Sequence, residues 1–100
     1  MIQGTTPKHV FVLPFHSDAV KSCEILYWQK GTEILKKSLD SCVTEGNEIS
    51  VKLTQEETFL FASDAFVEIQ LRVLTHDGEA LASKVMQISV HRCLSEEVLV

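Results

Sequence analysis

Apolar and polar residues alternate along much of this chain, and this period-two pattern constrains the fold more than any other feature of the sequence. The alternation is clearest at 48–54 and 66–75. Because successive side chains of a strand point to opposite faces of a sheet, each segment is expected to form a β-strand with one buried face. The residues expected to face the core are Ile49, Val51, Leu53, Val67, Ile69, Leu71 and Val73, whereas Ser50, Lys52 and Thr54 are expected to face outward.

Turn signals divide the rest of the chain into further strands. Strands are predicted at 8–13, 20–29, 32–38, within 41–47 and at 80–92. Pro14 ends the first of these, because proline cannot donate to a sheet ladder. The pairs Lys30-Gly31 and Asp77-Gly78 are typical of tight hairpin turns, in which glycine supplies a positive φ. The sequence therefore predicts six or seven antiparallel strands in one domain, residues 1–100.

A short helical turn is predicted between the strands at 48–54 and 66–75. Thr54 and Glu57 have the spacing of a capping box, in which each side chain hydrogen bonds to the backbone of the other residue. The cluster that follows is expected to plug the open end of a β-sandwich; its members are Phe59, Leu60 and Phe61. A lone helical turn between two late strands is typical of immunoglobulin-like domains.

The predicted fold class is therefore all-β, an immunoglobulin-like antiparallel β-sandwich of six to seven strands with one short helical turn near residues 55–61. In the strand lettering of such domains, 20–29 and 32–38 are strands C and C′, 48–54 is E, 66–75 is F and 80–92 is G. An aromatic residue of strand C, Tyr27 or Trp28, is expected in the middle of the core.

Charge and apolar patterning exclude several classes of function. The net charge is −5 and the nine lysine and arginine residues are scattered, so no nucleic-acid partner is expected. No apolar run approaches the ~18 residues that span a membrane, and the N-terminal segment lacks the pattern of a secretory signal peptide. The three cysteines lack the Cys-x-x-Cys spacing of zinc and redox sites. They are expected to be reduced thiols in a protein synthesised in the cytoplasm.

Two residue patterns bear on metal binding and catalysis. His91 and Cys93 share one face of a strand, but a zinc site needs at least three protein ligands, and the sequence suggests no others. A Cys–His–Asp nucleophile system lacks the nucleophile elbow, the glycine-rich loop and the cysteine signatures of known enzymes. Its members would be drawn from Cys23 or Cys42, His9 or His16, and Asp18 or Asp40. We therefore expect no catalytic site, no metal and no cofactor.

The strand at 20–29 carries the residues expected to form an interface. If its cysteine, isoleucine and tyrosine face the core, Leu26 and Trp28 point outward beside Glu24. Arg72, on the outer face of 66–75, then gives this patch a polar rim, as protein interfaces have. The alternative is the reversed register, in which Trp28 is the core tryptophan.

The layout of the chain resembles that of a phage protein family. The stretches that carry the resemblance are "HVFVLPF", "VKSCEILYWQKG", "EGNEISVKLTQEETFLF", "VEIQLRVLTHDGEALAS" and "VMQISVHRCL". They are similar to small proteins from phages and prophages of Gram-positive gut bacteria, and to the N-terminal β domain of phage baseplate upper proteins. The resemblance covers nearly the whole chain as a pattern and includes no catalytic motif. Baseplate proteins continue into further domains, so it implies the isolated module.

The expected function is that of a non-enzymatic structural or protein-interaction module, associated with a phage tail or baseplate. The resemblance implies a protein partner or self-association, with virion association after synthesis in the cytoplasm. The alternative is a carbohydrate-binding β-sandwich that uses Trp28 or Tyr27 as a stacking platform. Such sites usually align several aromatic side chains, and this chain has one tryptophan and one tyrosine.

Overall fold

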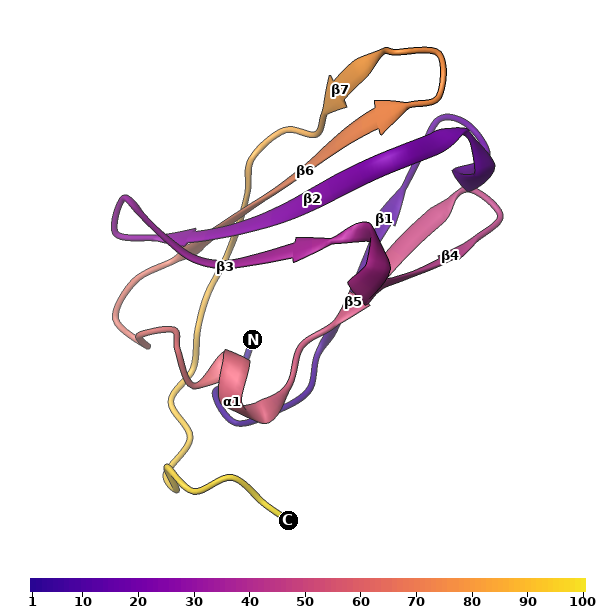
Figure 1. The fold of residues 1–100 in the computed structure, drawn as a ribbon. Helices are drawn as coiled ribbons and strands as arrows, with labels where there is room; N and C mark the ends of the chain where they lie inside the picture. The colour runs from indigo at the N-terminus through magenta and orange to yellow at the C-terminus, as the bar shows by residue number, and fades with distance from the viewer.

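Two antiparallel β-sheets face each other in the computed structural model, which describes all residues from 1 to 100 (Figure 1). The smaller sheet has three strands in the order β1 (Lys8–Val12), β5 (Glu48–Lys52) and β4 (Cys42–Glu45). The larger sheet has five, and its order begins β3 (Thr32–Ser38), β2 (Val20–Gln29), β6 (Val67–Thr75). The last two strands, β7 (Ala80–Ala82) and β8 (Met86–Ile88), both pair with β6.

The core lies between the sheets and is built from the alternating residues of each strand. All seven residues expected to face the core from the strands at 48–54 and 66–75 are buried. Ser50 was expected on an outer face and is also buried. It points outward but lies between Val10 and Val43, its neighbours across β1 and β4, and these side chains cover it. Ser50 therefore points outward as expected, but it is not exposed to solvent.

The predicted strands agree with the structure along most of the chain. Strands β2 and β3 have the predicted bounds, and the Lys30-Gly31 turn joins them. The single strand predicted at 80–92 is wrong, because it is interrupted between β7 and β8. Ala82 pairs with Arg72, and Met86 pairs with Ile69. Residues 83–85 therefore lie opposite residues 70–71 of β6, so the segment between β7 and β8 has one residue more than the β6 segment that it faces. This is a β-bulge, which splits the edge of the sheet and raises the strand count to eight.

A helical corner connects β5 to β6, as predicted. Helix α1 (Gln55–Thr58) begins with the capping box, in which the Thr54 hydroxyl accepts from the Glu57 amide and the Glu57 carboxylate accepts from the Thr54 amide. The predicted three-residue plug is only partly correct. Phe61 is buried against the Tyr27 ring, Phe59 is half-buried, and Leu60 is 57% exposed. Consecutive side chains of a tight turn point in different directions, so only one of them can fill the core.

Two 3-10 turns and the chain ends complete the fold. The turn η1 (Ser17–Ala19) precedes β2, and η2 (Leu39–Ser41) joins β3 to β4. The N-terminal segment runs beside the segment that follows β8, where Ile2 and His91 form a parallel bridge. The C-terminal tail passes α1 (Figure 1), where the Gln55 side chain hydrogen bonds to both backbone groups of Leu99. None of the helices is long and apolar enough to cross a membrane.

Candidate interaction surface

The outer face of the five-stranded sheet carries the residues expected to form an interface. Tyr27 and Ile25 of β2 are fully buried, whereas Trp28 is 40% exposed and Leu26 half-buried. The reversed register, with Trp28 in the core, is therefore wrong. We call the outer face that bears Leu26, Trp28, Glu24 and Arg72 the Trp28 surface.

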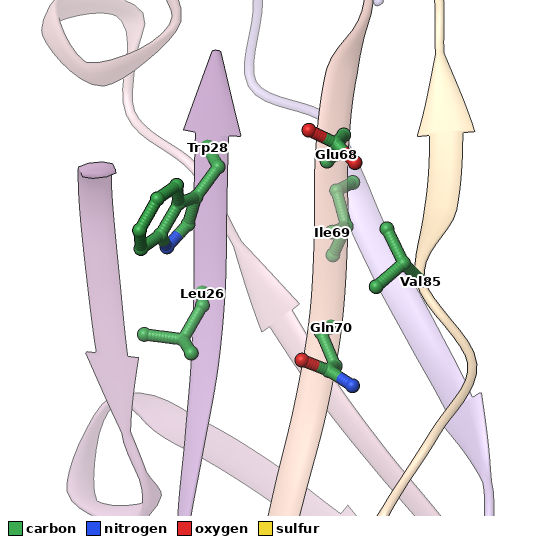
Figure 2. Close-up of a pocket in the computed structure, with 6 residues that line it drawn as sticks. All are labelled: Leu26, Trp28, Glu68, Ile69, Gln70 and Val85. Atoms are coloured by element: carbon green, nitrogen blue, oxygen red, sulfur yellow. The ribbon is translucent and has the colours of Figure 1, made fainter. Parts of the chain in front are cut away.

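A shallow hollow of about 250 Å³ lies at the Leu26 and Trp28 end of the Trp28 surface. Figure 2 shows Leu26 and Trp28 on β2, with Glu68 and Gln70 on the neighbouring β6. Val85, from the bulge between β7 and β8, and the buried Ile69 complete the lining. The exposed part of the lining therefore combines three apolar side chains with one carboxylate and one amide.

Two β-bulges position the side chains around this hollow. In the pairing of β2 with β3, Tyr27 lies opposite Leu35 but Trp28 lies opposite Glu33, so Ile34 is an extra residue. Bulges increase the local twist and re-aim the neighbouring side chains. The second bulge follows β7, and the Ser83 side chain holds it by accepting from the Leu71 amide at 3.0 Å. This bulge brings Val85 to the same hollow as Trp28.

A charged network borders the hollow on the same face. Glu24 accepts from Arg72 at 3.0 Å and pairs with Lys36 at 3.1 Å. The hydrogen bond from Lys36, with smaller contributions from Arg72, holds the pKa of Glu24 below its usual value. The structure therefore brings the predicted Glu24 and Arg72 into contact. Lys36 is a member that the sequence analysis missed.

The residues considered for metal binding and catalysis do not form a site. No group of three or more histidine, cysteine, aspartate or glutamate side chains is arranged to hold a metal ion. His9 Nδ1 hydrogen bonds to the Tyr27 hydroxyl, and the Cys42 thiol donates to a backbone carbonyl. His16 pairs with Asp18 in the exposed η1 turn. No cysteine thiol hydrogen bonds to a histidine ring, and the one histidine–aspartate contact is that of His16 with Asp18.

Comparison with known proteins found no matching family model, no matching curated protein and no matching solved structure. The interpretation of the Trp28 surface therefore rests on its own geometry. That geometry is an aromatic and aliphatic centre beside a three-residue charge network.

Proposed function

We propose that this domain is a non-enzymatic protein-interaction module and that the Trp28 surface is its contact site. The observation that carries this proposal is the partly exposed Trp28, which lines one hollow together with Leu26 and Val85. Tryptophan is enriched among the residues that anchor protein interfaces, and such anchors lie within a polar rim. The network of Glu24, Lys36 and Arg72 supplies a rim of both charge signs.

The order of the strands supports an immunoglobulin-like sandwich as the scaffold. With β2 as strand C, the sheet order β3-β2-β6-β7 corresponds to C′-C-F-G. The order β1-β5-β4 then corresponds to B-E-D, and α1 lies at the corner between E and F. In this scaffold the Trp28 surface is the outer face of the C-F-G sheet.

The resemblance to the N-terminal β domain of phage baseplate upper proteins extends the proposal to a setting. We propose that the module is a structural component of a phage tail or baseplate, made in the cytoplasm and then associated with the virion. Its partner would be another tail protein or a second copy of this chain, since tail components are commonly symmetric oligomers. An aromatic centre with a mixed-charge rim is compatible with either partner.

One observation favours the alternative of carbohydrate binding. The Trp28 ring shares its hollow with the Gln70 amide and the Glu68 carboxylate, which could hydrogen bond to sugar hydroxyl groups. Trp28 is, however, the one aromatic residue that lines the hollow. A glycan array distinguishes the two functions, because binding that Trp28→Ala abolishes would support the carbohydrate site instead.

Size-exclusion chromatography with light scattering tests the interaction proposal. The wild-type domain is expected to self-associate or to form a complex with another tail protein of its phage. Trp28→Ala should weaken that association about tenfold or more, as the loss of an interface anchor does. Leu94→Ala is the matched control, because Leu94 is 90% exposed and lies outside both sheets.

A charge variant and a spectroscopic signal complete the test. Arg72→Glu places a second carboxylate beside Glu24 and should also weaken association, while circular dichroism remains unchanged. Trp28 is the only tryptophan, so its emission should shift to shorter wavelength on association. A strict monomer whose partner binding is indifferent to both substitutions would contradict the proposal.

A further inference from the structure

Two cysteine thiols from opposite sheets meet inside the sandwich. Cys23 is buried on the inner face of β2. Cys42, the first residue of β4, lies opposite the buried Val51 of β5 and so points to the same interior. Cys42 packs against the core cluster that contains Cys23, and each thiol influences the pKa of the other.

The backbone around η2 holds the two thiols in this position. The Cys42 thiol donates to the Ser38 carbonyl at 3.3 Å, and Ser38 pairs with Glu24, the residue next to Cys23. The three-residue turn η2 is all that separates the end of β3 from Cys42. The edges of the two sheets are therefore tied together where the thiols meet.

We infer that Cys23 and Cys42 form a disulfide that links the two sheets when the protein meets a small disulfide oxidant such as oxidised glutathione. In the first step the Cys42 thiolate attacks one sulfur of the oxidant, its S–S bond breaks, and one glutathione thiolate leaves and takes up the proton that Cys42 lost. In the second step the deprotonated Cys23 attacks Cys42 Sγ. The second glutathione leaves as a thiolate and takes up the proton from Cys23. The two cysteines lose two electrons in total, and one oxidised glutathione gains them.

Burial of Cys23 and Cys42 determines how fast the disulfide forms, and the redox state of the compartment determines whether it forms. Burial, with smaller effects from Cys42 and Glu24, raises the pKa of Cys23 to about 12, and burial also raises the pKa of Cys42. Only thiolates attack disulfides, so oxidation should be slow near neutral pH and should accelerate as the pH rises. In a reducing compartment the pair stays as two thiols, and it closes when the protein enters an oxidising one. The disulfide then fixes the sheet that carries the Trp28 surface to the opposite sheet.

Cys93 provides a matched control within the same chain. Its backbone amide donates to the side chain of Gln3 in the N-terminal segment, and Cys93 is not among the groups that affect the pKa of Cys23 or Cys42. Oxidation that follows the inferred geometry must therefore leave Cys93 free. Oxidation by unspecific encounter would instead involve all three cysteines.

Oxidation of the folded protein with oxidised glutathione, followed by alkylation and intact-mass measurement, tests the inference. After alkylation, wild type should carry one alkyl group, on Cys93, and Cys93→Ser none. Both should show the loss of about 2 Da that a disulfide causes and yield a peptide that joins residues 23 and 42, whereas Cys23→Ala and Cys42→Ala should not. Closure of this loop should raise the Tm by about 5–15 °C, and dithiothreitol should reverse the shift. Stable glutathione adducts without loop closure, a disulfide that includes Cys93, or an unchanged Tm would overturn the inference. Cys23→Ser and Cys42→Ser provide second variants if either alanine variant fails to fold.

Discussion

The Tyr27 hydroxyl lies 2.7 Å from His9 Nδ1, and this contact joins the central strand β2 to the edge strand β1 of the opposite sheet. The two rings are 5.6 Å apart. Tyr27 is fully buried and His9 half-buried. Burial, with a smaller effect from the N-terminal ammonium group, holds the pKa of His9 below its usual value. The contact between the sheets is therefore made by a neutral imidazole ring.

This contact predicts that the domain loses stability as the pH falls below about 6.5. The unfolded chain takes up a proton on His9 near pH 6.5, whereas the folded protein does so only at its lowered pKa. The contribution of neutral His9 to the free energy of unfolding is thus fully present above pH 6.5. It is lost as the pH falls from 6.5 through the lowered pKa of the folded protein. Urea unfolding at pH 7.5 and 5.5 measures the decline, and His9→Gln should reduce it. His76→Asn, in the exposed turn after β6, should leave it unchanged; an equal decline in all three proteins would contradict the assignment to His9.

The ion pair between Lys37 and Glu57 predicts a second, more acidic dependence on pH. The two side chains are 2.5 Å apart and only 15% and 19% exposed. Burial favours the neutral carboxyl, but the hydrogen bonds from Lys37 and the Thr54 amide outweigh it and hold the pKa of Glu57 below its usual value. Stability from Glu57 is therefore complete above the unfolded-state value of about 4.3 and is lost as the pH falls through the folded value.

Glu57→Gln should lower the free energy of unfolding by about 1–2 kcal/mol at pH 7, because it leaves Lys37 half-buried without its partner. The difference from wild type should shrink toward pH 3, where wild-type Glu57 is also protonated. Glu56→Gln is the control, since Glu56 is exposed on the same turn and makes no side-chain hydrogen bond or ion pair. Chemical denaturation at both pH values gives the comparison. Equal effects of the two substitutions would argue against the role of the ion pair.

Gln29 holds the loop between α1 and β6, and its replacement predicts a large loss of stability. Its buried side chain donates to the carbonyls of Ala62 and Ala65 and accepts from the Ala62 amide. Gln29→Leu keeps the size of the side chain but leaves these three backbone groups unpaired. We expect the free energy of unfolding to fall by about 2–4 kcal/mol, measured from urea midpoints. Gln87→Leu, on the exposed face of β8, should change it by less than about 0.5 kcal/mol.

The sequence predicts the strands of this fold because each carries its own alternation of apolar and polar residues. It does not predict the bulge opposite Trp28, since no residue of β3 requires one. A two-residue turn at Lys30-Gly31 would place Lys36 opposite Ile25, on the inner face. The bulge moves Lys36 opposite Leu26, where it reaches Glu24, and turns Lys37 inward toward Glu57. One extra residue thus assembles both the charge network and the buried ion pair.

The sequence pattern also does not indicate the break between β7 and β8. Residues 80–92 contain no glycine or proline, so the sequence offers no breaker between β7 and β8. The break depends on Ser83, whose side chain accepts from the Leu71 amide and takes the place of a ladder contact. The sequence also could not predict which residues of the plug at 59–61 are buried. The N-terminal segment covers Phe59, whereas Leu60 stays exposed. Such features arise from contacts between distant segments, which local patterning does not encode.

The N-terminal segment gives the last prediction, because Gly4 sits directly against the Phe59 ring. Gly4 has a φ of +76°, and a Cβ atom there would lie 2.7 Å from Phe59 Cζ. Its amide also donates to the buried Thr58 hydroxyl, which itself donates to the Thr5 carbonyl.

Gly46 has a similar φ of +57° but open space around it. Gly46→Ala therefore carries the conformational cost alone, about 1 kcal/mol. Gly4→Ala should cost about 1–3 kcal/mol more, because a clash is added to the same strain. Thermal or urea unfolding of the two variants measures this difference. Equal losses of stability would mean that the N-terminal segment moves away from Phe59 at no cost.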